Sequence, residues 1–77
     1  MMHVLDEMIE SLQNRVNADI RQQNYGLASL SHSELSAYRE VRDGKPKDET
    51  PYHHSDMLYT YRQARATAEA MLNAKVQ

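Results

Sequence analysis

Apolar residues in the first third of the chain recur at the spacing of one face of an α-helix. They are separated by four, three, four and four positions: Leu5, Ile9, Leu12, Val16 and Ile20. Because an α-helix has about 3.6 residues per turn, these side chains form a single stripe. The sequence therefore predicts a helix over about residues 4–23. Asn24 and Gly26 are the candidates for the left-handed position that ends it.

A second stripe lies in the last third of the chain. Its members are spaced four, three, four and three positions apart: Met57, Tyr61, Ala64, Ala68 and Met71. This heptad-like seam predicts a helix over about residues 51–75 that packs against another helix. Thr50 can cap it with Pro51 as the first helical residue, and Ser55–Asp56 is a competing start.

Between the stripes, the sequence predicts a short helix over about residues 32–43. Ser31 and Glu34 have the spacing of a capping box, and Gly44 ends the segment. The expected fold is all-α, one domain over residues 1–77, with helices 4–23 and 51–75 packed antiparallel. A short middle helix would leave part of both long stripes uncovered, and we therefore expect a homodimer.

Composition narrows the function classes. The net charge is −2 and the pI is about 6.0, which argues against a nucleic-acid-binding domain because such domains are usually basic. The chain has no cysteine, no apolar run of the ~18 residues typical of a membrane span, and an acidic first segment unlike a signal peptide. We therefore expect a cytoplasmic protein that does not interact with a membrane.

The histidine pair His53–His54 is the most distinctive local motif, but its spacing does not favour a metal site. Adjacent helical residues point about 100° apart, whereas helical metal ligands lie three or four positions apart. Only His53 and Asp56 have such a spacing. No nucleophile motif or glycine-rich phosphate loop is present. The sequence predicts no metal, no cofactor and no enzymatic activity.

Two surface sets remain as candidate binding sites. The first combines tyrosine with charge around the start of the last helix: Tyr52, Asp56, Tyr59 and Arg62. Exposed tyrosine beside arginine is typical of protein–protein interfaces. The second set would contact nucleic acid: Arg21, Arg42, Lys45 and Lys47. Three of these cations, Arg42, Lys45 and Lys47, form a local basic cluster, but Asp43, Asp48 and Glu49 interrupt it. We therefore favour the first set.

The resulting hypothesis is a non-enzymatic protein that binds and modulates a partner protein. Small, cysteine-free, mildly acidic helical chains are typical of phage and plasmid proteins that inhibit a host factor, and this association suggests a host-factor inhibitor. A nucleic-acid-associated regulator is the alternative. A steep salt dependence of DNA binding would distinguish the two, since phosphate contacts release counterions.

Overall fold

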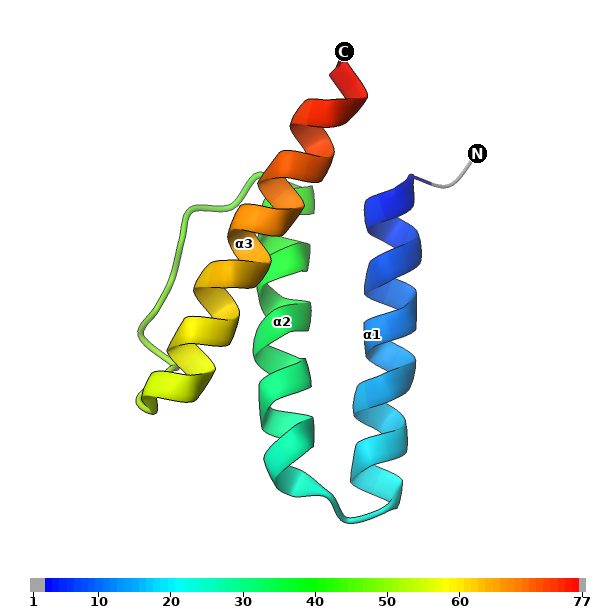
Figure 1. Ribbon diagram of the computed structural model, residues 1–77, viewed down its shortest axis with the longest axis vertical. Helices are drawn as coiled ribbons and strands as arrows, with labels where there is room; N and C mark the ends of the chain where they lie inside the picture. The colour runs from blue at the N-terminus through cyan, green and yellow to red at the C-terminus, as the bar shows by residue number, and fades with distance from the viewer. Residues whose placement is uncertain (1–2, 77) are drawn as a thin grey trace.

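The computed structural model describes residues 3–76 and the side chains of residues 3–74. It contains three helices, α1 (Val4–Arg21), α2 (Tyr25–Asp43) and α3 (Ser55–Val76), and no strand within the described part (Figure 1). The predicted all-α, three-helix fold is confirmed. Two details differ from the sequence-based expectation, namely the helix boundaries and the identity of the central helix.

The helix α2 lies between the other two. Helices α1 and α2 form an antiparallel hairpin, while α3 leans obliquely across α2 and runs in the same general direction as α2 (Figure 1). Helix α3 therefore runs antiparallel to α1, as expected, but the two barely touch. Small side chains on α2 allow both neighbours to approach closely: Ala28, Ser31, Ser33 and Ala37 are all buried. The predicted packing of the last helix against the first is replaced by packing against α2.

Helix α2 is longer than predicted because it begins at Tyr25 and not near His32. The α1–α2 turn is a Schellman motif, in which Asn24 N–H donates to the Asp19 carbonyl (2.8 Å) and Gln23 N–H to the Ile20 carbonyl (2.9 Å). Gln23 occupies the left-handed position, with φ 60°. The assignment of that position to Asn24 or Gly26 was therefore wrong. At the other end of α2, Gly44 (φ 72°) ends the helix as predicted.

Residues 44–54, which we call the strap, connect α2 to α3 without forming a helix. The strap runs back along α3 before the chain turns into it (Figure 1). The predicted start at Pro51 is wrong and the competing start at Ser55 is correct. His54 supplies the first helical carbonyl, which accepts from Leu58 N–H at 3.0 Å. Tyr52 instead turns inward, because its ring packs against Tyr61.

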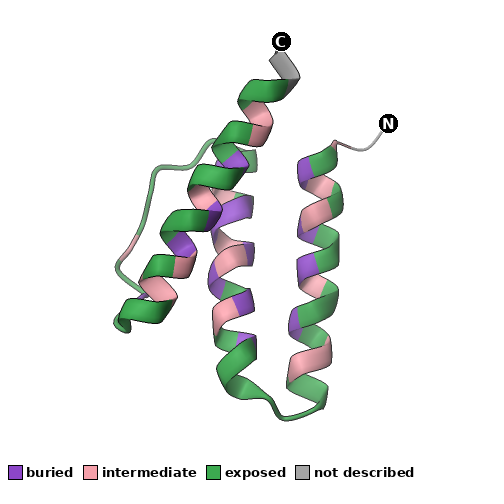
Figure 2. Cartoon of the chain, in the orientation of Figure 1, coloured by how far each residue is buried: buried purple, intermediate pink, exposed green. Residues whose placement is uncertain are grey.

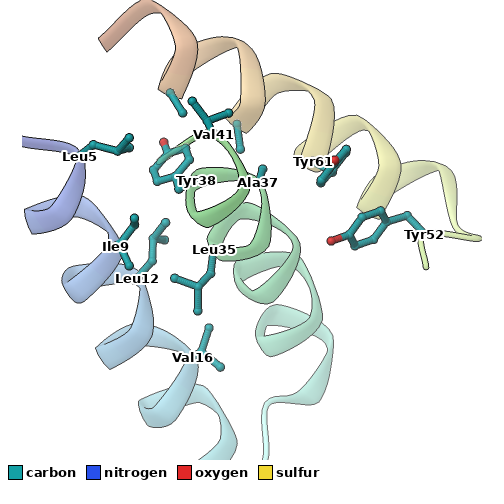
Figure 3. Packing of buried hydrophobic residues seen from close by; sticks show 12 residues of the cluster. Leu5, Ile9, Leu12, Val16, Leu35, Ala37, Tyr38, Val41, Tyr52 and Tyr61 are labelled. Carbon is teal, nitrogen blue, oxygen red and sulfur yellow. The ribbon is translucent and has the colours of Figure 1, made fainter. Parts of the chain in front are cut away.

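The core follows α2 on both sides (Figures 2 and 3). Both predicted stripes contribute to it, together with α2 and the strap: Leu5, Ile9, Leu12 and Val16; Tyr61, Ala64 and Ala68; Leu35, Ala37, Tyr38 and Val41; and Tyr52. Ile20 is the exception in the first stripe, since it is about half exposed. The Cα atoms extend over 41 × 27 × 15 Å, so the three helices form one flat layer.

A candidate protein-binding surface on helix α3

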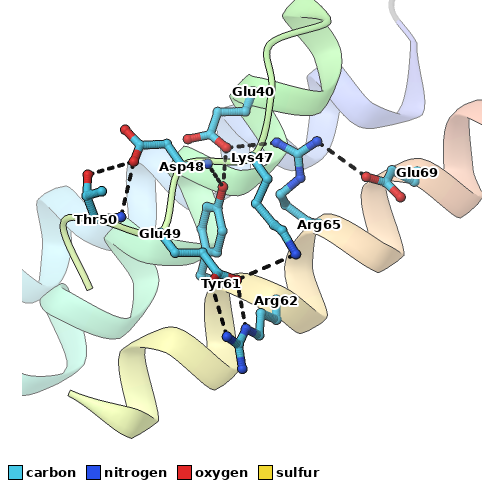
Figure 4. A network of polar contacts seen from close by, with 9 residues as sticks. All are labelled: Glu40, Lys47, Asp48, Glu49, Thr50, Tyr61, Arg62, Arg65 and Glu69. Atoms are coloured by element: carbon cyan, nitrogen blue, oxygen red, sulfur yellow. Dashed lines mark hydrogen bonds and ion pairs between the residues drawn. The ribbon is translucent and has the colours of Figure 1, made fainter. Parts of the chain in front are cut away.

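Tyr61 connects the strap to both neighbouring helices through its hydroxyl. The hydroxyl donates to the Glu40 carboxylate on α2 and accepts from Asp48 N–H in the strap at 2.9 Å (Figure 4). Arg65, one turn further along α3, donates to the same Glu40 oxygen at 2.8 Å. Burial, and then the bond to Glu40, raise the pKa of Tyr61. This network fixes α3 and the strap on α2.

Tyr52 belongs to this supporting structure and not to an outer surface. Its ring lies 4.6 Å from the Tyr61 ring, centroid to centroid, with a tilt of 30° between the planes. The side chain is buried, which raises the pKa of Tyr52. Two stacked aromatic rings add to burial by about 0.5–1.5 kcal/mol. The prediction that Tyr52 points outward to a partner was wrong because the strap folds inward at this residue.

Arg62 also holds the strap. Its guanidinium forms two hydrogen bonds with the Glu49 carboxylate, from Nε at 2.7 Å and from Nη2 at 3.0 Å (Figure 4). Lys47 lies 3.6 Å from the same carboxylate. The bonds from Arg62 lower the pKa of Glu49. Arg62 is accessible, but a partner that used its guanidinium would have to compete with Glu49.

Tyr59 and Asp56 are the predicted residues that remain free on the surface. Tyr59 is 67% exposed, the largest value among the large hydrophobic residues that are exposed. It borders a shallow cleft of about 210 Å³ between α2 and α3, lined also by Glu34, Tyr38, Thr60, Gln63, Ala64 and Thr67. Asp56 and Arg62 precede and follow Tyr59 by one turn. The structure thus brings three of the four predicted residues onto one face of α3.

A second hollow, which the sequence did not reveal, lies at the α1–α2 end of the molecule. We call it the tip groove. It is open and mainly apolar, has a volume of about 300 Å³, and is lined by Val16, Ile20, Tyr25, Ala28, Ser29, His32 and Met57. The one sequence feature that could have indicated the groove is the pair of large apolar residues, Ile20 and Tyr25, on either side of the predicted turn. We had expected Ile20 to be covered as a member of the first stripe.

Of the four cations predicted to contact nucleic acid, Arg21 lies apart from the cluster of Arg42, Lys45 and Lys47. Arg42 pairs with Asp43 at 2.9 Å and lies 3.7 Å from Asp6, while Lys47 is beside Glu49. Lys45 is exposed. Arg21 ends α1, next to the turn at the far end of the hairpin from the other three residues (Figure 1). Arg21 is therefore separated from the other three cations by the length of α2, and two of those three, Arg42 and Lys47, pair with carboxylates.

The four histidines are dispersed. His53 and His54 are exposed in the strap, His32 lines the tip groove, and His3 caps α1 by accepting from Leu5 N–H at 2.9 Å. Within residues 3–76, no three acidic or histidine side chains gather closely enough to hold a metal ion. The backbone carbonyl of His54 accepts a hydrogen bond in the first turn of α3, a role that does not involve its imidazole.

Neither the helices nor a comparison with known proteins adds a further indication of function. Across the described helices, none combines the length and the apolarity that crossing a bilayer requires. No protein-family model, no curated protein and no solved structure matches this chain.

Proposed function

We propose that this chain is a non-enzymatic cytoplasmic protein that binds and modulates a partner protein through the exposed face of α3 centred on Tyr59. The observation that carries this proposal is the exposure of Tyr59 beside a cleft with polar lining. Tyrosine is enriched among the residues that dominate binding energy, because its large ring loses little conformational entropy and its hydroxyl can form a hydrogen bond.

The supporting network favours this use of α3. Binding is stronger when the surface is already ordered, because less conformational entropy is lost on association. The bonds from Arg62 to Glu49, and from Tyr61 and Arg65 to Glu40, hold the strap and α3 in place behind the Tyr59 face. The cleft adds Glu34, Gln63 and Thr67, whose polar groups can pair with a partner's donors and acceptors.

The shape of three hollows on the described surface supports contact with a partner surface. They have volumes of about 210, 260 and 300 Å³ and all are open to solvent. Small-molecule sites usually bury most of their ligand, whereas open hollows can receive side chains from a partner surface.

The experiment is affinity capture followed by measured binding. The tagged chain is used to capture proteins from a lysate of its source cells, and the captured partner is purified for titration calorimetry. Tyr59→Ala should weaken binding at least about tenfold, which is ~1.4 kcal/mol. Val4→Ala is the control, because Val4 is exposed on α1 and lines neither hollow. If both variants weakened binding equally, or if neither weakened it, the Tyr59 face would not be the binding site.

A further inference from the structure

The tip groove is an apolar hollow that the fold itself does not fill. It lies between the last turns of α1 and the first turns of α2, with Met57 of α3 at its side. Ile20 and Tyr25, which line it, are 49% and 62% exposed. Neither residue takes part in the polar network or in the Tyr59 cleft. The groove therefore requires an explanation independent of the proposed function.

The surface area of the chain indicates that more than one side chain is left uncovered. A compact monomer of this mass, 8.9 kDa, is expected to expose about 4,800 Å². This chain exposes 5292 Å². The excess of about 500 Å² belongs to the whole chain and does not measure the groove itself. A standard interface buries ~800 Å² per partner, so a dimer would have to cover surface beyond the groove.

The charge around the groove identifies the kind of surface that can cover it. Apart from His32, which lines the groove, Asp19 and Arg21 are the only acidic or basic residues between positions 16 and 33, although Asp, Glu, Lys and Arg make up 26% of the chain. The Asp19 carboxylate already accepts from the Ser31 hydroxyl at 3.5 Å. The centres of stable interfaces are depleted of charge in the same way. A segment with no net charge neither repels a copy of itself nor selects a charged partner.

We propose that a second copy of this chain occupies the tip groove, in a symmetric homodimer that joins the two hairpin ends. In such a dimer each subunit presents the same patch, so a self-complementary surface with one hollow and one protruding ring is sufficient. Tyr25 is the protruding ring, and it docks beside its own counterpart at the two-fold axis, against Ile20 and Met57 of the other copy. The Tyr59 face lies outside the interface and remains available to a different partner.

Sedimentation equilibrium of the full chain tests the dimer and its location. The wild type should sediment with twice the 8.9 kDa chain mass at micromolar concentration. Ile20→Glu should raise the dissociation constant at least about tenfold, since it places a charge in the apolar interface. Val4→Glu is the matched control, because Val4 is 56% exposed at the opposite end of α1 and does not line the groove. Circular dichroism checks that both variants remain helical.

Disulfide trapping provides a second readout that does not depend on a disruptive charge. The chain has no cysteine, so Tyr25→Cys introduces a single thiol near the proposed two-fold axis. Oxidation should cross-link Tyr25→Cys into dimers and leave Val4→Cys, at the opposite end of α1, largely monomeric. A wild type that stays monomeric at all concentrations would overturn the proposal. So would equal dissociation by the two glutamate variants, or equal cross-linking by the two cysteine variants.

Discussion

Single residues determine where each helix of this protein ends. Both ends of α2 adjoin a left-handed residue, with Gln23 before it and Gly44 after it. In both turns the next residue's N–H donates to a carbonyl five positions earlier, Asn24 to Asp19 and Lys45 to Glu40, each at 2.8 Å. Gly44 adopts this conformation without steric cost, whereas the side chain of Gln23 makes the same conformation unfavourable. The α1–α2 turn therefore contains local strain that the α2–strap turn lacks.

Replacing Gln23 with glycine should stabilise the protein. Gln23→Gly removes the side-chain clash at φ 60° and retains both hydrogen bonds of the turn, and we expect the free energy of unfolding to rise by about 0.5–1 kcal/mol. For a domain of this size, such a gain raises the melting temperature by several degrees. Urea unfolding followed by circular dichroism measures the change.

The adjacent residue provides the control. Gln22 has φ −88°, which any residue adopts readily. Gln22→Gly should therefore lower stability, because glycine loses more backbone entropy on folding. If Gln23→Gly also lowered stability, the side chain of Gln23 would have to contribute more than its backbone conformation costs.

At the scale of whole elements, the strap is a non-helical segment held by side chains at several points. Glu49 accepts from Arg62, Tyr61 accepts from Asp48 N–H, and Tyr52 stacks on the Tyr61 ring. The Thr50 hydroxyl donates to the Asp48 carboxylate and lowers its pKa, as Arg62 does for Glu49. The Glu49 carboxylate thus attaches the strap to α3, whereas the Asp48 carboxylate acts within the strap.

The contact between the strap residue Glu49 and Arg62 should make the free energy of unfolding depend on pH in the acid range. The folded chain lowers the pKa of Glu49 below its ordinary value of 4.5, so the contribution of this group is fully present above pH 4.5. It is lost as the pH falls through the lowered folded-state value. Glu49→Gln removes the contribution, and the loss of stability between pH 7 and the acid range should therefore be smaller than in the wild type.

Urea unfolding at a series of pH values measures this difference. The control is Glu10→Gln, an exposed substitution on α1 away from the strap. It should change the pH profile less than Glu49→Gln does. Identical profiles for Glu49→Gln and the wild type would show that the contact between Arg62 and Glu49 has no effect on stability.

Helix existence could be predicted from the sequence, whereas helix boundaries could not. The stripes of α1 and α3 have a clear helical period, and most of their members are buried. The first turns of α2, from Tyr25 to Ser31, contain glycine and serine, which have weak helix propensity. Burial of Ala28 and the bond from Ser31 to Asp19 explain why they are nonetheless helical. Both contacts depend on α1, which a local pattern cannot show.

The residues of the candidate surface could likewise be predicted from the sequence only in part. Tyr59 lies on the exposed face of α3 because it falls opposite the seam, which helical periodicity alone determines. Asp56 is exposed one turn before it. Tyr52 could not be placed, because its inward orientation depends on a ring from another element, Tyr61. The tip groove was equally hidden, since it depends on where α3 stops covering the hairpin.

At the scale of the whole molecule, the arrangement is one layer with α2 at its centre. Helix α2 contacts α1 along one side and α3 along the other, and the outer helices have little contact with each other. The core is therefore two strips joined through α2, one with Leu12 and Leu35 and one with Tyr61 and Ala37 (Figure 3). Neither strip encloses the other, so each is stabilised mainly by its own pair of helices.

This layered arrangement has a consequence for how the native state opens. An outer helix can detach by breaking one strip, whereas α2 loses its cover on both sides only when both strips break. Amide hydrogen exchange should thus be slowest in the middle of α2, around Leu35 to Tyr38, and faster in α1 and α3. Exchange measured by NMR would contradict this if the slowest amides lay in an outer helix. Slow exchange confined to α2 would mean that either flank opens while the central helix stays protected.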